Sequence, residues 1–107
     1  MECHVEAGPK TKRYIEAMLP SMMKQLGLTR SRKLLMIKVD RDFEEQGTTI
    51  PLTGIDTFLV VLKPTRDILN LGITLAHELT HVAQFANGTL QLTTETSVVT
   101  VYFSEIP

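Results

Sequence analysis

A long helical pattern over residues 66–87 limits the possible folds more than any other feature of this sequence. Thr65 can cap its start, Pro64 precedes it and Gly88 follows it, and these residue types commonly mark the ends of helices. At about 1.5 Å per residue, such a helix is on the order of 33 Å long. In a chain of 107 residues, the rest of the domain must therefore pack around this helix.

The two sides of this helix differ in composition. At about 100° per residue, one side is an apolar stripe made of Ile68, Leu71, Leu75, Leu79, Val82 and Ala86. The other side gathers Asn70, Thr74, His77, His81 and Gln84, with Glu78 and Phe85 on its flank. From residue 68 to residue 87 there is no lysine or arginine, and Glu78 is the only charged residue. Such a polar side is typical of a cleft wall, whereas a solvated surface usually carries several charges.

His77, Glu78 and His81 form a His-Glu-x-x-His pattern in the middle of the helix. Histidines four residues apart lie one helical turn apart, so both can reach one tetrahedral metal ion at about 2.0–2.1 Å. The glutamate beside the first histidine can then act as a general base for an attacking water. The pattern is short enough to occur by chance on a surface helix, but its position opposite an apolar stripe favours a metal site.

The segment TLAHELTHVAQFANG, residues 74–88, resembles the active-site helix of zincin metallopeptidases. It is most similar to SprT-like proteins, minigluzincins and phage-type metallopeptidases, and the resemblance covers residues 57–90 as a strand, a turn and the helix. It implies that His77 and His81 bind Zn²⁺, that Glu78 is the general base, and that the chain is a zinc metalloendopeptidase acting on a peptide or protein substrate. The third histidine of metzincins is missing, so the resemblance points to the gluzincin branch, whose third ligand is a glutamate.

The third zinc ligand is the open part of this hypothesis. Glu95 is the predicted ligand, because the turn expected at Gly88 lets the following chain fold back onto the metal. Glu105 is an alternative near the end of the chain. In phage-type relatives the ligand lies in a segment resembling Pro-Trp-Glu-x-Glu-Ala, and the sequence stops at YFSEIP, where such a segment would begin. A ligand beyond residue 107, in a longer natural protein, is therefore the third alternative.

Two other functional hypotheses follow from the same residues. A Cys3 thiolate could occupy the open position of the zinc ion and keep the enzyme as a latent precursor. The helix could also belong to a zinc-binding or interaction module without catalytic activity. An extended peptide substrate is expected to add to a strand, either at 57–63 or at 48–51. Phe85 would line a specificity pocket or pack against the tail.

The remaining elements predict a single α+β domain over residues 1–107, with a minimal zincin-like fold. We expect a helix over 11–28, which Pro20 either kinks or divides, and a buried strand over 33–40. A loop over 41–56 contains a short edge strand near Thr49 and Ile50. A further strand spans 57–63. The tail favours a strand over 98–103 by propensity, or a helix capped by Thr93 or Thr94.

Composition excludes several classes of function. A net charge of −1 provides no surface for nucleic acid, and no apolar stretch approaches the roughly 18 residues that span a membrane. The first ten residues lack the apolar core of a secretion signal, so a cytoplasmic location is expected. A single cysteine excludes an internal disulfide. The oligomeric state is left open.

Overall fold

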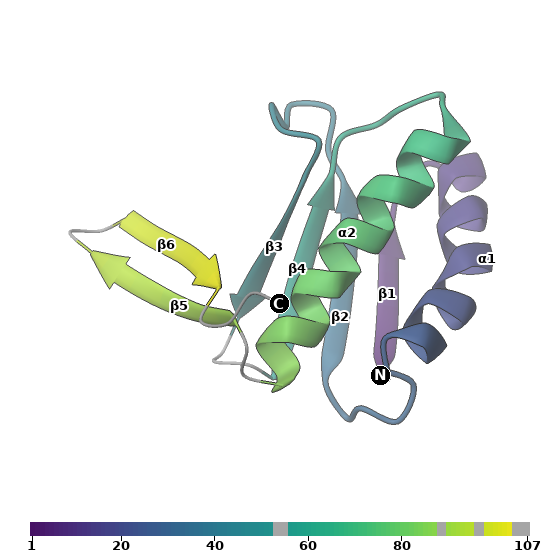
Figure 1. The fold of residues 1–107 in the computed structure, drawn as a ribbon. Coiled ribbons are helices and arrows are strands. Elements are labelled where there is room, and N and C mark those ends of the chain that lie inside the picture. The colour runs from purple at the N-terminus through teal and green to yellow at the C-terminus, as the bar shows by residue number, and fades with distance from the viewer. Residues whose placement is uncertain (53–55, 88–89, 96–97, 104–107) are drawn as a thin grey trace.

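Two helices lie against a four-stranded mixed sheet, and a two-stranded hairpin follows the second helix (Figure 1). This computed structural model describes residues 1–52, 56–87, 90–95 and 98–103, and the side chains within the first two of these ranges. In chain order the elements are β1 (Glu2–Glu6), α1 (Pro9–Gln25), β2 (Leu34–Val39), β3 (Gly47–Leu52), β4 (Thr57–Leu62), α2 (Ile68–Asn87), β5 (Leu90–Glu95) and β6 (Val98–Phe103). The α+β class predicted from the sequence is confirmed.

The sheet has the strand order β1-β2-β4-β3. Strands β1, β2 and β4 are parallel, and β3 runs antiparallel to β4. The strands predicted at 33–40 and 57–63 are confirmed, as is the edge strand near Thr49. Because β2 and β4 are each paired on both sides, β1 and β3 are the two edges of this sheet.

Strand β1 was not predicted, although its sequence alternates as a half-buried strand does. Cys3 and Val5 are partly buried toward the helices, whereas Glu2, His4 and Glu6 are exposed. The pattern is short and polar, so it gives little apolar periodicity to recognise. Its pairing with β2 decides the conformation, since every residue of β1 has a register partner there.

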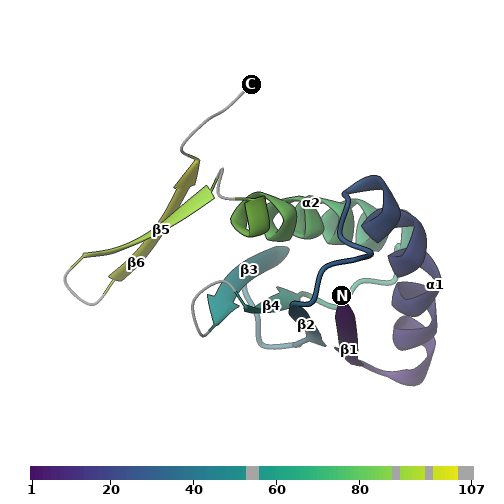
Figure 2. The same ribbon diagram turned by 90° about the horizontal axis from the view of Figure 1, so that it is seen from below.

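The hydrophobic core lies between one face of the sheet and the helices. Helix α2 crosses this face over β3 and β4, and α1 packs beside α2 near β1 (Figures 1 and 2). The fully buried side chains are Ile15, Leu35, Ile37, Phe58, Val60, Leu62, Leu75, Leu79 and Val82. Four positions of the predicted apolar stripe of α2, Leu71, Leu75, Leu79 and Val82, are buried as expected.

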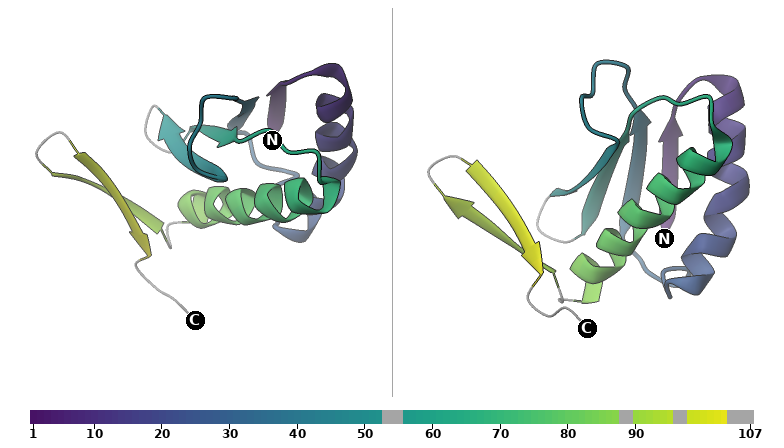
Figure 3. Two further views of the ribbon diagram at one scale, coloured as in Figure 1. Left: turned by 90° about the horizontal axis from the view of Figure 1, so that it is seen from above. Right: turned by 45° about the horizontal axis from the view of Figure 1, so that its top comes forward.

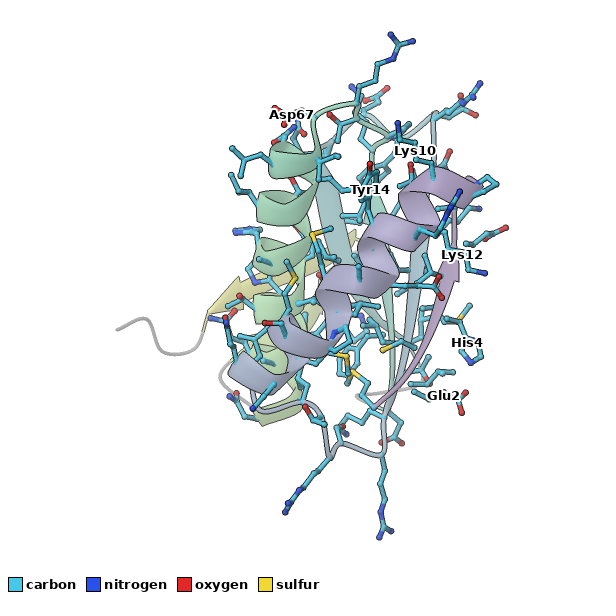
Figure 4. The ribbon with its side chains drawn as sticks, turned by 90° about the vertical axis from the view of Figure 1, so that its right-hand side faces the viewer. Glu2, His4, Lys10, Lys12, Tyr14 and Asp67 are labelled. Carbon is cyan, nitrogen blue, oxygen red and sulfur yellow. The ribbon has the colours of Figure 1, made fainter. Side chains whose placement is uncertain are left out.

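The prediction for Ile68 was wrong, because this side chain is 45% exposed. The first turns of α1 and α2 leave a pocket of about 320 Å³ between them, and Ile68 lines it with Lys10 and Tyr14. Figure 4 shows Lys10 and Tyr14 on α1 near Asp67 at the start of α2.

Helix boundaries differ from the sequence expectation at two places. Pro20 lies inside the single helix α1 and does not divide it, so the two-helix alternative is wrong. Helix α2 begins two residues later than predicted, and Asp67 caps it in place of Thr65. The Oδ1 atom of Asp67 accepts hydrogen bonds from the backbone N–H groups of Leu69 at 3.0 Å and Asn70 at 3.3 Å. Thr65 instead accepts a bond from the Asp67 N–H at 3.2 Å.

The tail forms strands, so the helical alternative over these residues is wrong. Strands β5 and β6 pair antiparallel, with Leu90 opposite Phe103 and Glu95 opposite Val98. Figure 3 shows this hairpin beside the end of α2 and apart from the main sheet. Within the described residues, neither helix is long and apolar enough to cross a membrane.

Candidate metal centre

His77 and His81 meet on the outer side of α2. Their Nε2 atoms lie 3.1 Å apart, and the two rings are nearly perpendicular, with centroids 4.6 Å apart. The helix itself produces this arrangement, because residues four apart lie one above the other on one face. The predicted pair is therefore brought together, at a distance that also suits a hydrogen bond between the two Nε2 atoms.

Gln84 orients the second histidine. Its Oε1 atom lies 3.0 Å from Nδ1 of His81. An amide oxygen only accepts hydrogen bonds, so this contact favours the tautomer in which Nδ1 of His81 carries the proton. The Nε2 atom of His81 then presents its lone pair, which is the form of imidazole that binds metals.

The spacing of the two histidines fits a zinc ion. Two nitrogens bound to tetrahedral zinc at about 2.0–2.1 Å lie about 3.3 Å apart. The observed 3.1 Å differs from this by an amount that a small ring rotation supplies. His77 is also exposed, so an ion can reach the pair from solvent. The two imidazole nitrogens and their spacing are therefore compatible with zinc.

Glu78 turns inward, between α2 and the edge strand β3. Its side chain is only 5% exposed, and Oε1 accepts a hydrogen bond of 2.7 Å from Oγ1 of Thr49. The same hydroxyl lies 3.0 Å from the backbone carbonyl oxygen of Glu78. Thr49 is itself 8% exposed, so this contact lies in the protein interior.

Gly47 makes this close approach of β3 and α2 possible. A Cβ atom at Gly47 would lie 3.0 Å from Cγ2 of Thr74, 3.1 Å from Cγ of Glu78 and 3.2 Å from Cδ2 of Leu62. These distances are tighter than ordinary van der Waals contact. A side chain at Gly47 would therefore push the strand away from the glutamate.

The candidate site thus consists of the imidazoles of His77 and His81, which lie close together, and the buried carboxylate of Glu78, which follows His77 in the chain. Comparison of the chain with protein-family models, curated protein sequences and solved structures gives no match.

The third ligand stays a prediction. Glu95 is the last residue of β5, at the far end of this strand from α2, and its side chain lies outside the described residues. Glu105 lies outside them entirely. Among the residues whose side chains are described, no three His, Cys, Asp or Glu residues come together as a metal-binding group. Of the three expected ligands, the structure therefore describes the side chains of two, His77 and His81.

The structure places Cys3 away from the strand that contacts the candidate site, which disfavours the hypothesis of a Cys3 block. Cys3 lies in β1, at the opposite edge of the sheet from β3, and its Sγ packs 3.5 Å from Sδ of Met23. With strands about 4.8 Å apart, β1 and β3 are separated by about 14 Å. Burial raises the pKa of the Cys3 thiol, which disfavours the thiolate that zinc requires.

Sequence reasoning also left Phe85 undecided and missed two roles. Phe85 is buried, and its ring centroid lies 6.2 Å from that of Phe58 in β4, so it belongs to the core. Gln84 was assigned only to the polar face, and Thr49 only to an edge strand. The i to i+3 spacing from His81 is a usable sign for Gln84, whereas the contact of Thr49 depends on the sheet.

Proposed function

We propose that the chain is a zinc-dependent metallopeptidase of the zincin type, with a gluzincin-like ligand set. The observation that carries this proposal is the pair of Nε2 atoms 3.1 Å apart, next to a buried glutamate on the same helix. In this proposal His77 and His81 hold the ion, and Glu95 is the expected third ligand. When bound, zinc polarises the scissile carbonyl and makes the attacking water acidic near neutral pH.

Glu78 supplies the acid–base chemistry. Its carboxylate takes a proton from the attacking water and passes it to the leaving amine, so the water oxygen joins the carbonyl carbon with no covalent enzyme intermediate. The hydroxyl of Thr49 donates a hydrogen bond to Oε1 of Glu78, so in this proposal Oε2 accepts the proton of the water. Gln84 keeps the His81 lone pair on Nε2.

Strand β3 is the better of the two expected substrate strands. Strand β4 is paired with both β2 and β3, so its backbone groups are already used. Strand β3 is an edge and contacts α2 through Thr49, beside the proposed base. An extended peptide adding to this edge would run close to Glu78. A cytoplasmic location remains part of this proposal.

A zinc-binding or interaction module without peptidase activity is the second candidate. It is supported by the same histidine pair, because the Nε2 atoms of His77 and His81 lie close enough together to hold an ion whether or not hydrolysis follows.

One experiment separates the two candidates. Zinc content and hydrolysis of a mixture of fluorogenic peptides are measured on the wild type, Glu78→Gln, His77→Ala and His4→Ala. His4 is the matched control, since it is exposed on β1 and pairs with Glu2 at 2.7 Å (Figure 4).

The peptidase proposal predicts that the Glu78→Gln variant keeps its zinc, while its rate of peptide hydrolysis falls by a factor of about 10²–10⁴. His77→Ala should lose both zinc and activity, and His4→Ala should keep both. Zinc without hydrolysis in the wild type would favour the binding module. A wild type that binds no zinc would exclude both candidates.

A further inference from the structure

A second side chain contacts the proposed general base from another element. Thr49 of β3 and Glu78 of α2 are 29 residues apart in the chain, and their side chains are joined by a hydrogen bond of 2.7 Å. The same hydroxyl lies 3.0 Å from the backbone carbonyl oxygen of Glu78, so Oγ1 of Thr49 contacts this residue at two oxygens. Both residues are buried, so water does not compete for the contact.

The surroundings restrict Glu78 at two points along its side chain. Its Cγ lies 3.1 Å from where a Cβ atom at position 47 would stand, and its Oε1 accepts a hydrogen bond from Thr49. Thr49 is itself rigid, because it is β-branched and lies in a paired strand opposite Val60. A glutamate side chain, which is flexible when free, is thereby confined to one orientation.

We propose that Thr49 is a positioning residue for Glu78 in peptide hydrolysis. Its hydroxyl holds Oε1, so that Oε2 is the oxygen that accepts the proton of the attacking water and later delivers it to the leaving amine. The inference rests on the proposed function, since it assigns a role within that reaction. It requires that the hydroxyl of Thr49 affect turnover more than substrate binding.

A matched control lies next to Thr49 in the same strand. Thr48 pairs with Val61, and its side chain points to the opposite face of the sheet because successive residues of a strand alternate. Thr48→Val therefore makes the same chemical change in β3 without touching Glu78. Thr49→Val and Thr49→Ser separate the hydroxyl of Thr49 from its methyl group.

The experiment measures zinc content, kcat and KM for the wild type, Thr49→Val, Thr49→Ser, Thr49→Ala and Thr48→Val. Small misplacements of catalytic groups cost up to about 100-fold in rate. We expect Thr49→Val to lower kcat about tenfold or more, with KM within about twofold and zinc content unchanged. Thr49→Ser should stay within about threefold of the wild-type kcat, and Thr48→Val should equal the wild type.

Each other outcome overturns the role of Thr49. If the kcat of the Thr49→Val variant equals that of the wild type, the hydroxyl does not position the base. The same conclusion holds if the Thr49→Ser and Thr49→Ala variants lose kcat equally. If both hydroxyl-free variants fail to fold while Thr49→Ser folds, the hydroxyl is structural. A wild type without zinc or hydrolysis instead refutes the proposed function, and the two failures are thereby distinguished.

Discussion

Gly47 of β3 and Glu78 of α2 approach so closely that a Cβ atom on the glycine would lie 3.1 Å from Cγ of the glutamate. This approach brings the edge strand next to the carboxylate that we propose as the general base. The next inward-facing residue of the strand, Thr49, then reaches Oε1. The absence of a side chain at residue 47 therefore shapes the candidate site.

Replacing Gly47 by alanine should destabilise the fold and disturb the site. The added methyl group would press on Thr74, Glu78 and Leu62, and overpacking of this kind costs about 1–3 kcal/mol. Urea denaturation measures the loss. Gly8→Ala is the control, because no atom lies within 4 Å of its added Cβ, and it should change stability by less than about 1 kcal/mol. Equal stability of the two variants would contradict the close contact.

Replacing Gln84 by methionine should weaken zinc binding while leaving both histidines in place. Gln84 accepts the Nδ1 hydrogen bond of His81, and loss of such a partner lowers metal affinity by about 10–100-fold. Competition with a chromophoric chelator measures the affinity. Thr80→Ala serves as the control, since its hydroxyl donates to the carbonyl of Ala76 and should not affect zinc. Unchanged affinity in Gln84→Met would exclude this orienting role.

Asp67 and Thr65 should differ in their effect on stability. Asp67 accepts two backbone N–H bonds at the start of α2, so Asp67→Ala should cost about 1 kcal/mol. Thr65 precedes the cap, and Thr65→Ala should cost less than half of that. Thermal or urea denaturation of the two variants gives the comparison. A larger loss in Thr65→Ala would restore the earlier start of the helix that the sequence predicted.

Cys3 should make the stability of the protein depend on alkaline pH. Burial raises the pKa of its thiol, and Glu2 adds to this, while the amino terminus opposes it. A raised pKa in the folded state contributes stability that is complete below the ordinary value of about 8.5 and is lost as the pH rises through the folded value. The free energy of unfolding should therefore fall more between pH 7 and pH 10 in the wild type than in Cys3→Ala.

The same Cys3→Ala variant tests whether the thiol blocks the candidate site. Cys3 packs against Met23 at the far edge of the sheet, so its removal should leave zinc content and peptide hydrolysis at pH 7 unchanged. Activity that appears only in Cys3→Ala would contradict this placement. Equal pH dependence of stability in both proteins would show that the thiol is not desolvated.

Local sequence information was sufficient for the elements with strong periodicity. The helix over residues 68–87 follows from its apolar repeat, and β4 follows from its β-branched and aromatic run. The convergence of His77 and His81 was also predictable, because the spacing of i and i+4 is a property of any α-helix. Strand β1 was missed, since it is short and depends on pairing with β2.

Contacts between distant residues were decided only by the tertiary structure. The partner of Glu78 is Thr49, 29 residues earlier, and no local pattern relates the two. The position of Cys3 across the sheet from β3 depends on the strand order, which the parallel crossover through α1 sets. The sequence by itself thus determined the histidine pair, because one helix builds it. The packing of β3 against α2 determined how the carboxylate beside that pair is held, because hydrogen bonds and close contacts across elements exist only after the chain has folded.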